Sequence, residues 1–240
     1  MALTQRREEA GIILTVEEQE FRGDILLLAA GRTPQVAGLD LEQAGVTYSP
    51  QGIPVDSKLR TNVKHIYAVG DCIRGNYQFT HLAGWQAFQA ARNALLPGSS
   101  RGFSNVVPWT TFTDPEVAHV GLTEAQARDK FGEAVAVTRW NLDRVDRAVC
   151  ENDRAGFIKV VHKKDGALLG ATIVAQRAGE TITEFVLALQ RGLKLGDLAG
   201  AIHVYPTYAT TVQQLAAEVA TDNFLNSLLG RLAQVLTRSG

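Results

Sequence analysis

The stretch His65-Ile66-Tyr67-Ala68-Val69-Gly70-Asp71 is the most informative part of this 240-residue chain. Its β-branched and aromatic residues predict a strand over residues 65–69, which ends in a glycine and an aspartate. Gly70 has no Cβ, so the backbone can approach a ligand closely at that point. Asp71 adds a carboxylate that can accept a hydrogen bond from a ligand hydroxyl. The stretch therefore predicts a binding site at the end of a strand.

A helix is predicted directly after the following loop, from Thr80 to Leu95, and Pro97-Gly98 ends it. Thr80, His81, Leu82 and Ala83 form its first turn. Backbone N–H groups and the helix dipole favour partial negative charge at a helix N-terminus. We expect this first turn to face an electron-rich group of the same ligand. The plainer alternative is a turn residue at Asp71 followed by an ordinary helix start.

The composition is that of a water-soluble globular protein, with 45% hydrophobic and 20% charged residues. A net charge of −1 argues against nucleic acid or an anionic membrane as the main partner. No apolar run reaches the roughly 18 residues of a membrane span. The polar N-terminus, with Gln5-Arg6-Arg7-Glu8-Glu9, contains no apolar signal core, and two cysteines give no disulfide framework. These features predict a cytoplasmic protein.

The N-terminal part has the pattern of an α/β nucleotide-binding domain. Gly11–Val16 is predicted as a strand, Glu17–Gly23 as a polar turn and Asp24–Gly31 as a buried strand without alternation. Leu39–Gly45 predicts a short helix with a glycine stop, and Ile53–Asp56 a short strand.

The pattern changes after the run Leu96–Gly102, which is the best candidate for a domain boundary. Beyond it, five predicted strands form an antiparallel sheet: Trp109–Phe112, Val117–Gly121, Val135–Trp140, Gly156–His162 and Leu168–Val174. Lys164-Asp165-Gly166 is the turn between the last two strands. Thr123 is a candidate N-cap of a helix. Further helices are predicted at Ala178–Gly192, Leu195–Ile202, Thr210–Ala220 and Asn223–Leu236. This order indicates an α+β domain with its helices on one face of the sheet.

Four segments together resemble the flavoprotein disulfide reductases, also called class I pyridine nucleotide-disulfide oxidoreductases. They are Ala29–Pro34, Thr61–Asp71, Phe112–Gly121 and His203–Thr207, and they follow one another in the order that the family has. The closest similarity is to the mercuric reductase-like branch.

The resemblance implies a fold class of α/β plus α+β, in which remnants of the FAD- and NAD(P)-binding domains precede a dimerisation domain. The implied domains are 1–31 (end of the NAD(P)-binding domain), 32–102 (end of the FAD-binding domain), 103–222 (dimerisation domain) and 223–240 (helical tail). The tail has an apolar stripe that suits packing on the body or on a partner subunit, with a membrane-surface helix as the alternative.

The resemblance also implies cofactors and site residues. FAD would be contacted by Gly70, Asp71 and the first helix turn, residues 80–83. Arg32, which can equally be a plain surface residue, would line the cofactor crevice, and NAD(P)H would be the co-substrate. Homodimers would form through the C-terminal domain. No metal site is expected, because His119, His162 and His203 have no metal-ligand spacing.

Parts of the family pattern are missing. A complete enzyme has a Gly-x-Gly-x-x-Gly fingerprint for the FAD pyrophosphate and a second for the nicotinamide cofactor. Neither occurs here, and the only cysteines, Cys72 and Cys150, form no redox pair. We therefore expect the chain to be the C-terminal half of a flavoprotein.

The catalytic edge also departs from the pattern. Dihydrolipoamide dehydrogenases and glutathione reductases place a His before Pro-Thr and a Glu five residues later. Tyr205 takes the His place and Thr210 the Glu place. A phenol with a pKa near 10 is a poor base at pH 7. We expect Tyr205 to act as a neutral hydrogen-bond donor, the alternative being a Tyr packed in the dimer core.

The sequence is compatible with two functions. In the first, the parent enzyme passes electrons from NAD(P)H through FAD to a disulfide, thiol or metal-ion acceptor. In the second, the chain is a non-catalytic dimerisation module that binds no FAD by itself.

Overall fold

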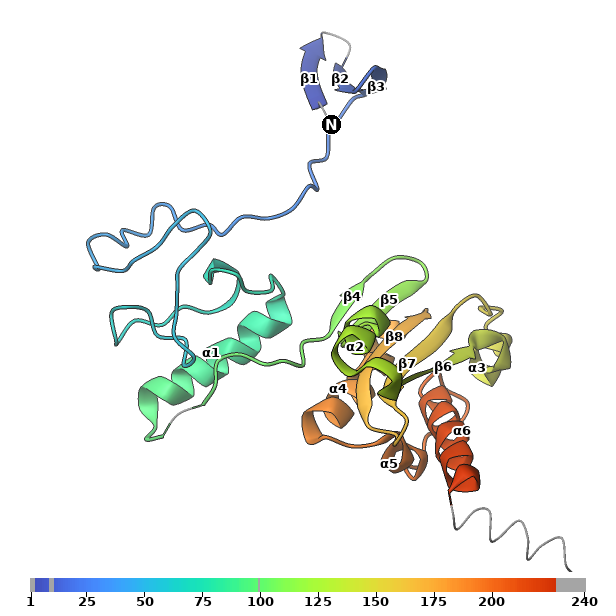
Figure 1. Cartoon of the computed structure of the whole chain (residues 1–240). Helices are drawn as coiled ribbons and strands as arrows, with labels where there is room; N and C mark the ends of the chain where they lie inside the picture. The colour runs from blue at the N-terminus through green and yellow to red at the C-terminus, as the bar shows by residue number, and fades with distance from the viewer. Residues whose placement is uncertain (1–2, 9–10, 99, 228–240) are drawn as a thin grey trace, which may run out of the picture. The chain divides into compact units, whose positions relative to one another are not determined.

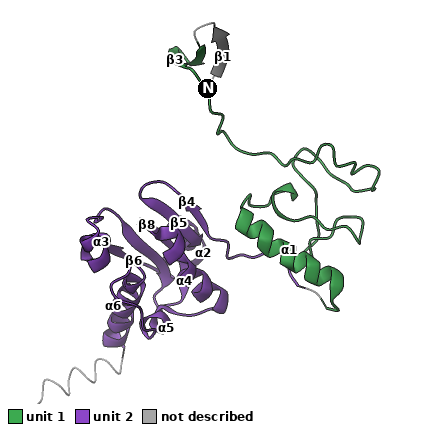
Figure 2. Cartoon of the chain, turned by 180° about the vertical axis from the view of Figure 1, so that it is seen from behind, with its two compact units in different colours: residues 1–98 green, residues 99–240 purple. Residues whose placement is uncertain are grey.

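The structure, a computed structural model, describes residues 3–8, 11–98 and 100–227 (Figure 1). It divides between Gly98 and Ser99 into two compact units (Figure 2). The division falls inside the Pro-, Gly- and Ser-rich run Leu96–Gly102.

Unit 1 begins with a three-stranded antiparallel sheet in the order β1-β2-β3. Its strands are β1 (Leu3–Glu8), β2 (Gly11–Val16) and β3 (Gln19–Gly23). The prediction of β2 is confirmed. The polar turn predicted over residues 17–23 is wrong, because Val16 pairs directly with Gln19 and only two residues make the turn. Glu17 reaches a positive φ of 58° there.

The buried strand predicted over Asp24–Gly31 is also wrong. The segment has no strand pairing, and Ile25, Leu27 and Leu28 are 86%, 84% and 78% exposed. An apolar strand without alternation is stable only when other strands and helices cover both of its faces. The described residues supply no such neighbours, so the segment stays extended and exposed.

The middle of unit 1 has little regular structure. Leu39–Gly45 forms only a turn, in which the N–H groups of Gln43 and Ala44 both donate to the carbonyl of Asp40. The predicted strands at residues 53–56 and 65–69 are reduced to single bridges, as between Ile53 and Ile73. One bridge makes no ladder, so apolar packing holds this part together. Its core consists of Val36, Val46, Ile53, Leu59, Ala68, Ile73 and Ala90.

Helix α1 (Thr80–Leu95) has the bounds that the sequence predicted. It buries Leu82, Gln86 and Ala90 against the rest of unit 1. The short 3₁₀ helix η1 (Gly70–Cys72) contacts α1, so the most informative stretch and the predicted helix do meet.

Unit 2 is built on a five-stranded antiparallel sheet in the order β4-β5-β8-β7-β6 (Figure 1). The strands are β4 (Trp109–Thr111), β5 (Glu116–Gly121), β6 (Val135–Asn141), β7 (Phe157–Lys163) and β8 (Leu168–Ala175). The helices are α2 (Glu124–Phe131), α3 (Asp146–Cys150), α4 (Ala178–Arg191), α5 (Leu195–Ala199) and α6 (Thr210–Asn226), with 3₁₀ turns η2 (Gly132–Ala134) and η3 (Leu142–Arg144). The predicted antiparallel sheet is confirmed, as is the cap of α2, where Thr123 and Gln126 form a capping box.

Helices cover both faces of this sheet, which corrects the prediction of a single covered face. The main core joins one face of the sheet to apolar residues of α4, α5 and α6. Val160 lies in that core, whereas the next residue, Val161, clusters with Ala127 of α2. Because consecutive strand residues point to opposite faces, α2 packs on the other side.

The last helix differs from the sequence pattern as well. α6 runs without a break to Asn226, so no separate helix begins at Asn223. Residues 228–236 of the predicted tail helix lie outside the described residues.

We predict that Phe185→Ala lowers the free energy of unfolding of unit 2 by about 3–5 kcal/mol, because a fully buried aromatic ring leaves a cavity. Leu187→Ala, two residues along α4 and 56% exposed, is the matched control and should cost at most about 0.5 kcal/mol. Urea unfolding followed by circular dichroism measures both. An equal loss of unfolding free energy in the two variants would contradict the role of Phe185 as a core residue.

Candidate functional site

The first part of the site is the close contact between Gly70 and helix α1. Gly70 has a positive φ of 72°, and a Cβ built there would lie 2.6 Å from the Cβ of Ala83. Only glycine allows both the left-handed backbone and this approach. Gly70 therefore lets the first turn of α1 pack directly against it.

A buried polar network fixes this contact. The Gly70 N–H donates to Oε1 of Gln86 at 2.8 Å, and Gln86 is fully buried. Asn76 donates from Nδ2 to the Gly70 carbonyl and to the same Gln86 oxygen, both at 3.0 Å. Sequence reasoning missed Asn76 and Gln86, because a polar residue on a buried helix face has no local signature.

Asp71 lies at the surface beside this network, with its side chain 46% exposed. Nη1 of Arg32 comes within 3.9 Å of its Oδ2, so the structure brings together two of the predicted site residues. Both side chains are accessible to a ligand. An exposed pair of this kind contributes little stability and can be separated at little cost.

The first turn of α1 supplies the remaining predicted residues. Thr80 and His81 are exposed, whereas the Leu82 side chain is buried and can offer a ligand only its backbone. The N-cap residue Phe79 makes no side-chain capping hydrogen bond, and the first turn contains no acidic residue. The His81 ring stacks on Phe79 at 5.2 Å. The partial positive charge at the N-terminus of α1 is therefore not offset by a capping or acidic side chain, and it favours electron-rich groups.

The second part of the site is the edge of unit 2 that carries Tyr205. Its side chain is 66% exposed, and its hydroxyl donates to Oδ2 of Asp146 at 2.9 Å. This hydrogen bond to a carboxylate raises the pKa of Tyr205 above the usual value for a phenol. Tyr205 is therefore a neutral phenol at pH 7, and its proton already has an acceptor.

Thr210 does not orient Tyr205, although it stands where related enzymes have a glutamate. Its hydroxyl donates to the carbonyl of Val204 at 2.9 Å, and Thr207 donates to the same carbonyl at 2.6 Å. The Thr210 N–H donates in turn to Oγ1 of Thr207. These bonds tie the loop to the start of α6.

A histidine–carboxylate pair is nevertheless present two residues before Tyr205. Nε2 of His203 lies 2.8 Å from Oε1 of Glu184 on α4, and Nδ1 lies 3.0 Å from the Ala201 carbonyl. The His203 side chain is only 9% exposed. This pair anchors the loop to α4, and no local sequence pattern indicates it.

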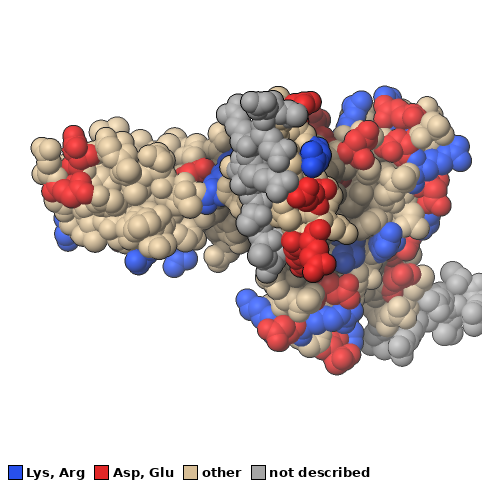
Figure 3. All heavy atoms as spheres, turned by 90° about the horizontal axis from the view of Figure 1, so that it is seen from above, with Lys and Arg blue, Asp and Glu red and all other residues tan. Residues whose placement is uncertain are grey.

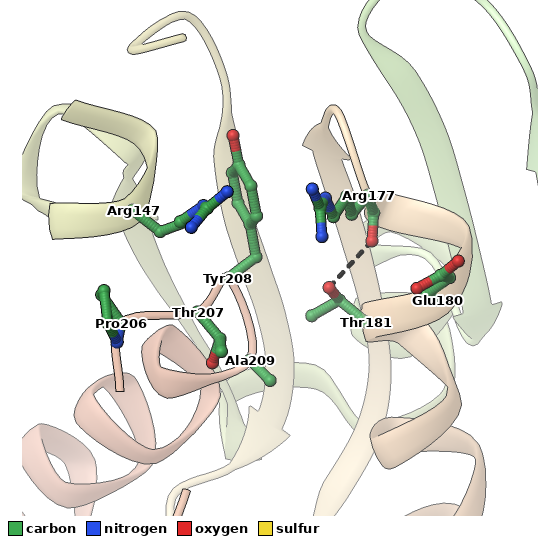
Figure 4. Close-up of a pocket in the computed structure, with 8 residues that line it drawn as sticks. All are labelled: Arg147, Arg177, Glu180, Thr181, Pro206, Thr207, Tyr208 and Ala209. Carbon is green, nitrogen blue, oxygen red and sulfur yellow. Dashed lines mark hydrogen bonds between the residues drawn. The ribbon is translucent and has the colours of Figure 1, made fainter. Parts of the chain in front are cut away.

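A cavity of about 330 Å³ opens beside the same loop, lined by Arg147, Arg177, Glu180, Thr181, Pro206, Thr207, Tyr208 and Ala209 (Figure 4). The guanidinium groups of Arg147 and Arg177 extend toward its middle from opposite walls. Glu151 is hydrogen-bonded to Arg147 and lies 3.6 Å from Arg177. It also accepts a hydrogen bond from the buried Tyr208 hydroxyl. Because Glu151 offsets these cations, the cavity is polar but not strongly cationic.

The remaining histidines and the cysteines were also candidates for chemistry. The sheet buries His119 and His162, and burial lowers the pKa of both imidazoles. Cys72 donates to the Val69 carbonyl, and Cys150 is exposed at the end of α3. Within the described part of the chain, no group of three His, Cys, Asp or Glu side chains could hold a metal ion.

The surface view shows mixed charge. Lys and Arg alternate with Asp and Glu on the face drawn in Figure 3, without one large basic area. Among the described helices, none is both long and apolar enough to cross a bilayer.

Comparisons with known proteins assign both units to one group. Residues 2–87 match the profile of pyridine nucleotide-disulphide oxidoreductases, and residues 107–216 match the dimerisation domain of the same enzymes. A dihydrolipoyl dehydrogenase of Haloferax volcanii is 38% identical over 93% of this chain and 48% of its own length. A mercuric reductase of Shigella flexneri is 39% identical over 88% of this chain and 37% of its own length.

Solved structures give the same result. The HOCl-induced flavoprotein disulfide reductase RclA of Escherichia coli superposes with a TM-score of 0.81 at 28% identity, over 89% of this chain and 49% of that one. LpdA of Mycobacterium tuberculosis gives a TM-score of 0.82 at 29% identity, over 90% and 47%. The chain thus spans about half the length, or less, of the relatives that it matches.

The fold is therefore that of the flavoprotein disulfide reductases, with nucleotide-domain segments followed by a dimerisation domain. The chain belongs to the pyridine nucleotide-disulphide oxidoreductase family.

We predict that Gly70→Ala destabilises unit 1 by about 1–3 kcal/mol more than Gly75→Ala. Both glycines have nearly the same φ, 72° and 73°, but a Cβ at Gly75 would meet nothing within 4 Å. The difference between the two variants therefore isolates the clash with Ala83 from the backbone strain. Thermal unfolding monitored by circular dichroism provides the comparison, and identical losses would exclude the clash.

Proposed function

We propose that this chain is the C-terminal portion of a homodimeric, cytoplasmic flavoenzyme that passes electrons from NAD(P)H through FAD to a disulfide, a thiol or a metal ion. One observation carries the proposal: Gly70 and Asp71 are set against the first turn of α1, in a chain that also has the family's dimerisation domain. The two parts supply a cofactor clamp and a subunit edge.

The residues present fit a flavin. The glycine at position 70 brings Asp71 next to the first turn of α1, and the accessible Asp71 carboxylate suits hydrogen bonds from ribityl hydroxyls. The first-turn N–H groups of α1 suit the electron-rich edge of the ring. FAD, when bound, would supply the hydride and electron transfer, and these residues would hold and orient it. Arg32 would be displaced from Asp71 or would line the same crevice.

Tyr205 would act at the edge of the dimerisation domain. It would meet the redox centre of a partner subunit across a two-fold axis, the commonest geometry of homodimers. A phenol keeps a neutral hydrogen-bonding oxygen at this position without changing its charge, unlike the histidine of thiol-exchanging relatives. The tyrosine at this position supports the mercuric reductase-like branch. The nearly equal identities to a dihydrolipoyl dehydrogenase and a mercuric reductase do not favour either.

The second candidate function is a dimerisation module that holds no FAD by itself. The exposed apolar segment with Ile25, Leu27 and Leu28 supports it, because no described strand or helix covers this segment.

We predict that the isolated 240-residue chain retains no stoichiometric FAD after dialysis, because the residues that would bind the pyrophosphate are absent. Visible absorption of the dialysed protein is the measurement. A yellow protein with one FAD per chain would show instead that Gly70, Asp71 and α1 suffice for tight binding. That result would exclude a dimerisation module that holds no FAD and would support the proposed flavoenzyme.

For the complete protein encoded by the gene, we predict that Tyr205→Phe lowers turnover of the acceptor roughly ten- to a hundredfold. The variant lacks the phenol oxygen and its hydrogen bond to the charged Asp146, and a hydrogen bond to a charged group contributes about 1.5–3 kcal/mol. Dimer affinity and stability should hardly change. Tyr48→Phe is the control, because the Tyr48 hydroxyl donates to Glu42 within unit 1 and not to Asp146. Unchanged turnover with weaker dimers would favour a tyrosine that merely packs in the interface.

A further inference from the structure

The Tyr205 edge contains a second residue whose role follows from geometry. Tyr205 and Asp146 are 59 positions apart in sequence, yet the phenol and the carboxylate meet at 2.9 Å. We propose that Asp146 is the positioning residue of this edge: it accepts the hydrogen bond of the Tyr205 hydroxyl, fixes the ring and leaves the lone pairs of the phenol oxygen facing outward.

The backbones that carry Asp146 and Tyr205 are each anchored independently of the hydrogen bond between them. Asp146 is the first residue of α3, and its neighbours Val145 and Ala148 are 2% and 0% exposed. Tyr205 stands on a loop that His203 ties to Glu184. The pair thus joins two anchored backbones, so the loss of conformational freedom on forming the hydrogen bond is small compared with that of two mobile side chains.

This arrangement changes the chemistry of the phenol. A tyrosine hydroxyl has one hydrogen to donate and lone pairs that accept. Because the hydroxyl hydrogen of Tyr205 is directed to Asp146, the phenol oxygen can only accept a hydrogen bond from an incoming group. The negative charge of Asp146 on its other side strengthens this preference. The edge therefore selects groups that donate a hydrogen bond, such as a neutral thiol, a hydroxyl or an amide N–H, and disfavours thiolates. The sequence alone predicts a donor to the incoming group, whereas the Tyr205 hydrogen is directed to Asp146.

The other charged and titratable groups nearby leave this assignment intact. Arg147, next in the chain, is paired with Glu151 and is not a competing partner of the phenol. The charge of the exposed Cys150 contributes to the same rise in the pKa of Tyr205. An experiment on the phenol must therefore remove Cys150 first.

The test is the titration of Tyr205 in the 240-residue chain carrying Cys150→Ser. Tyrosines labelled with ¹³C at Cζ report the ionisation of each phenol by NMR, and Tyr205→Phe identifies the resonance among the five. Asp146→Asn should move the midpoint of Tyr205 downward, because the negative charge that opposes ionisation is gone. Asp146→Glu should restore part of the elevation. Asp143→Asn, an exposed carboxylate in the preceding turn, is the matched control and should leave the midpoint in place.

Two results would overturn the proposal. One is an unchanged midpoint in Asp146→Asn, which would show that the hydrogen bond does not form in solution. The other is an equal shift in Asp143→Asn, which would show a general effect of charge and no specific partner.

The catalytic meaning of the pair rests on the proposed function and needs a separate measurement. In the complete flavoenzyme, Asp146→Asn should lower acceptor turnover, and adding it to Tyr205→Phe should cause no further loss. Additive losses would separate the two residues and contradict the positioning role. If the complete protein does not oxidise NAD(P)H at all, the proposed function fails, while the titration still decides whether Asp146 holds Tyr205.

Discussion

The burial of α4 against the sheet is the interaction on which the candidate catalytic edge depends. Phe185 is fully buried between the sheet and the helices that cover it. Glu184, its neighbour on the same helix, can hold His203 only because α4 is fixed in that position. The burial of Phe185 therefore also determines the position of the loop around His203, because Glu184, which holds this loop, is the adjacent residue on the helix.

A comparable constraint operates in unit 1 on a smaller scale. Strand ladders are almost absent between residues 24 and 79, so the polypeptide there is fixed by apolar packing and by a few buried polar contacts. The fully buried Gln86 is the most important of these, because it receives hydrogen bonds from both Gly70 and Asn76. An unpartnered amide at that position would carry a desolvation cost, so the network holds η1 and α1 in one arrangement.

Most of unit 2 could be predicted from the sequence, because its strands and helices have clear apolar periods and its turns contain suitable residues. Helix α1 was predicted to the residue for the same reason. The failures have physical causes. Asp24–Gly31 has the composition of a central strand, but composition does not show whether other strands cover the segment, and among the described residues none does. The contacts of Tyr205 with Asp146 and of His203 with Glu184 join positions 59 and 19 residues apart, and no local pattern records such pairs.

The anchoring of the loop before α6 has a consequence for assembly. Val204 is held through its carbonyl by two threonines, His203 by a glutamate and Tyr205 by an aspartate, all within one chain. The entropy of ordering this loop is therefore lost when the unit folds and not when subunits meet. A second subunit docking on this edge would find a preorganised surface, and its association rate would be limited by orientation and not by a search among loop conformations.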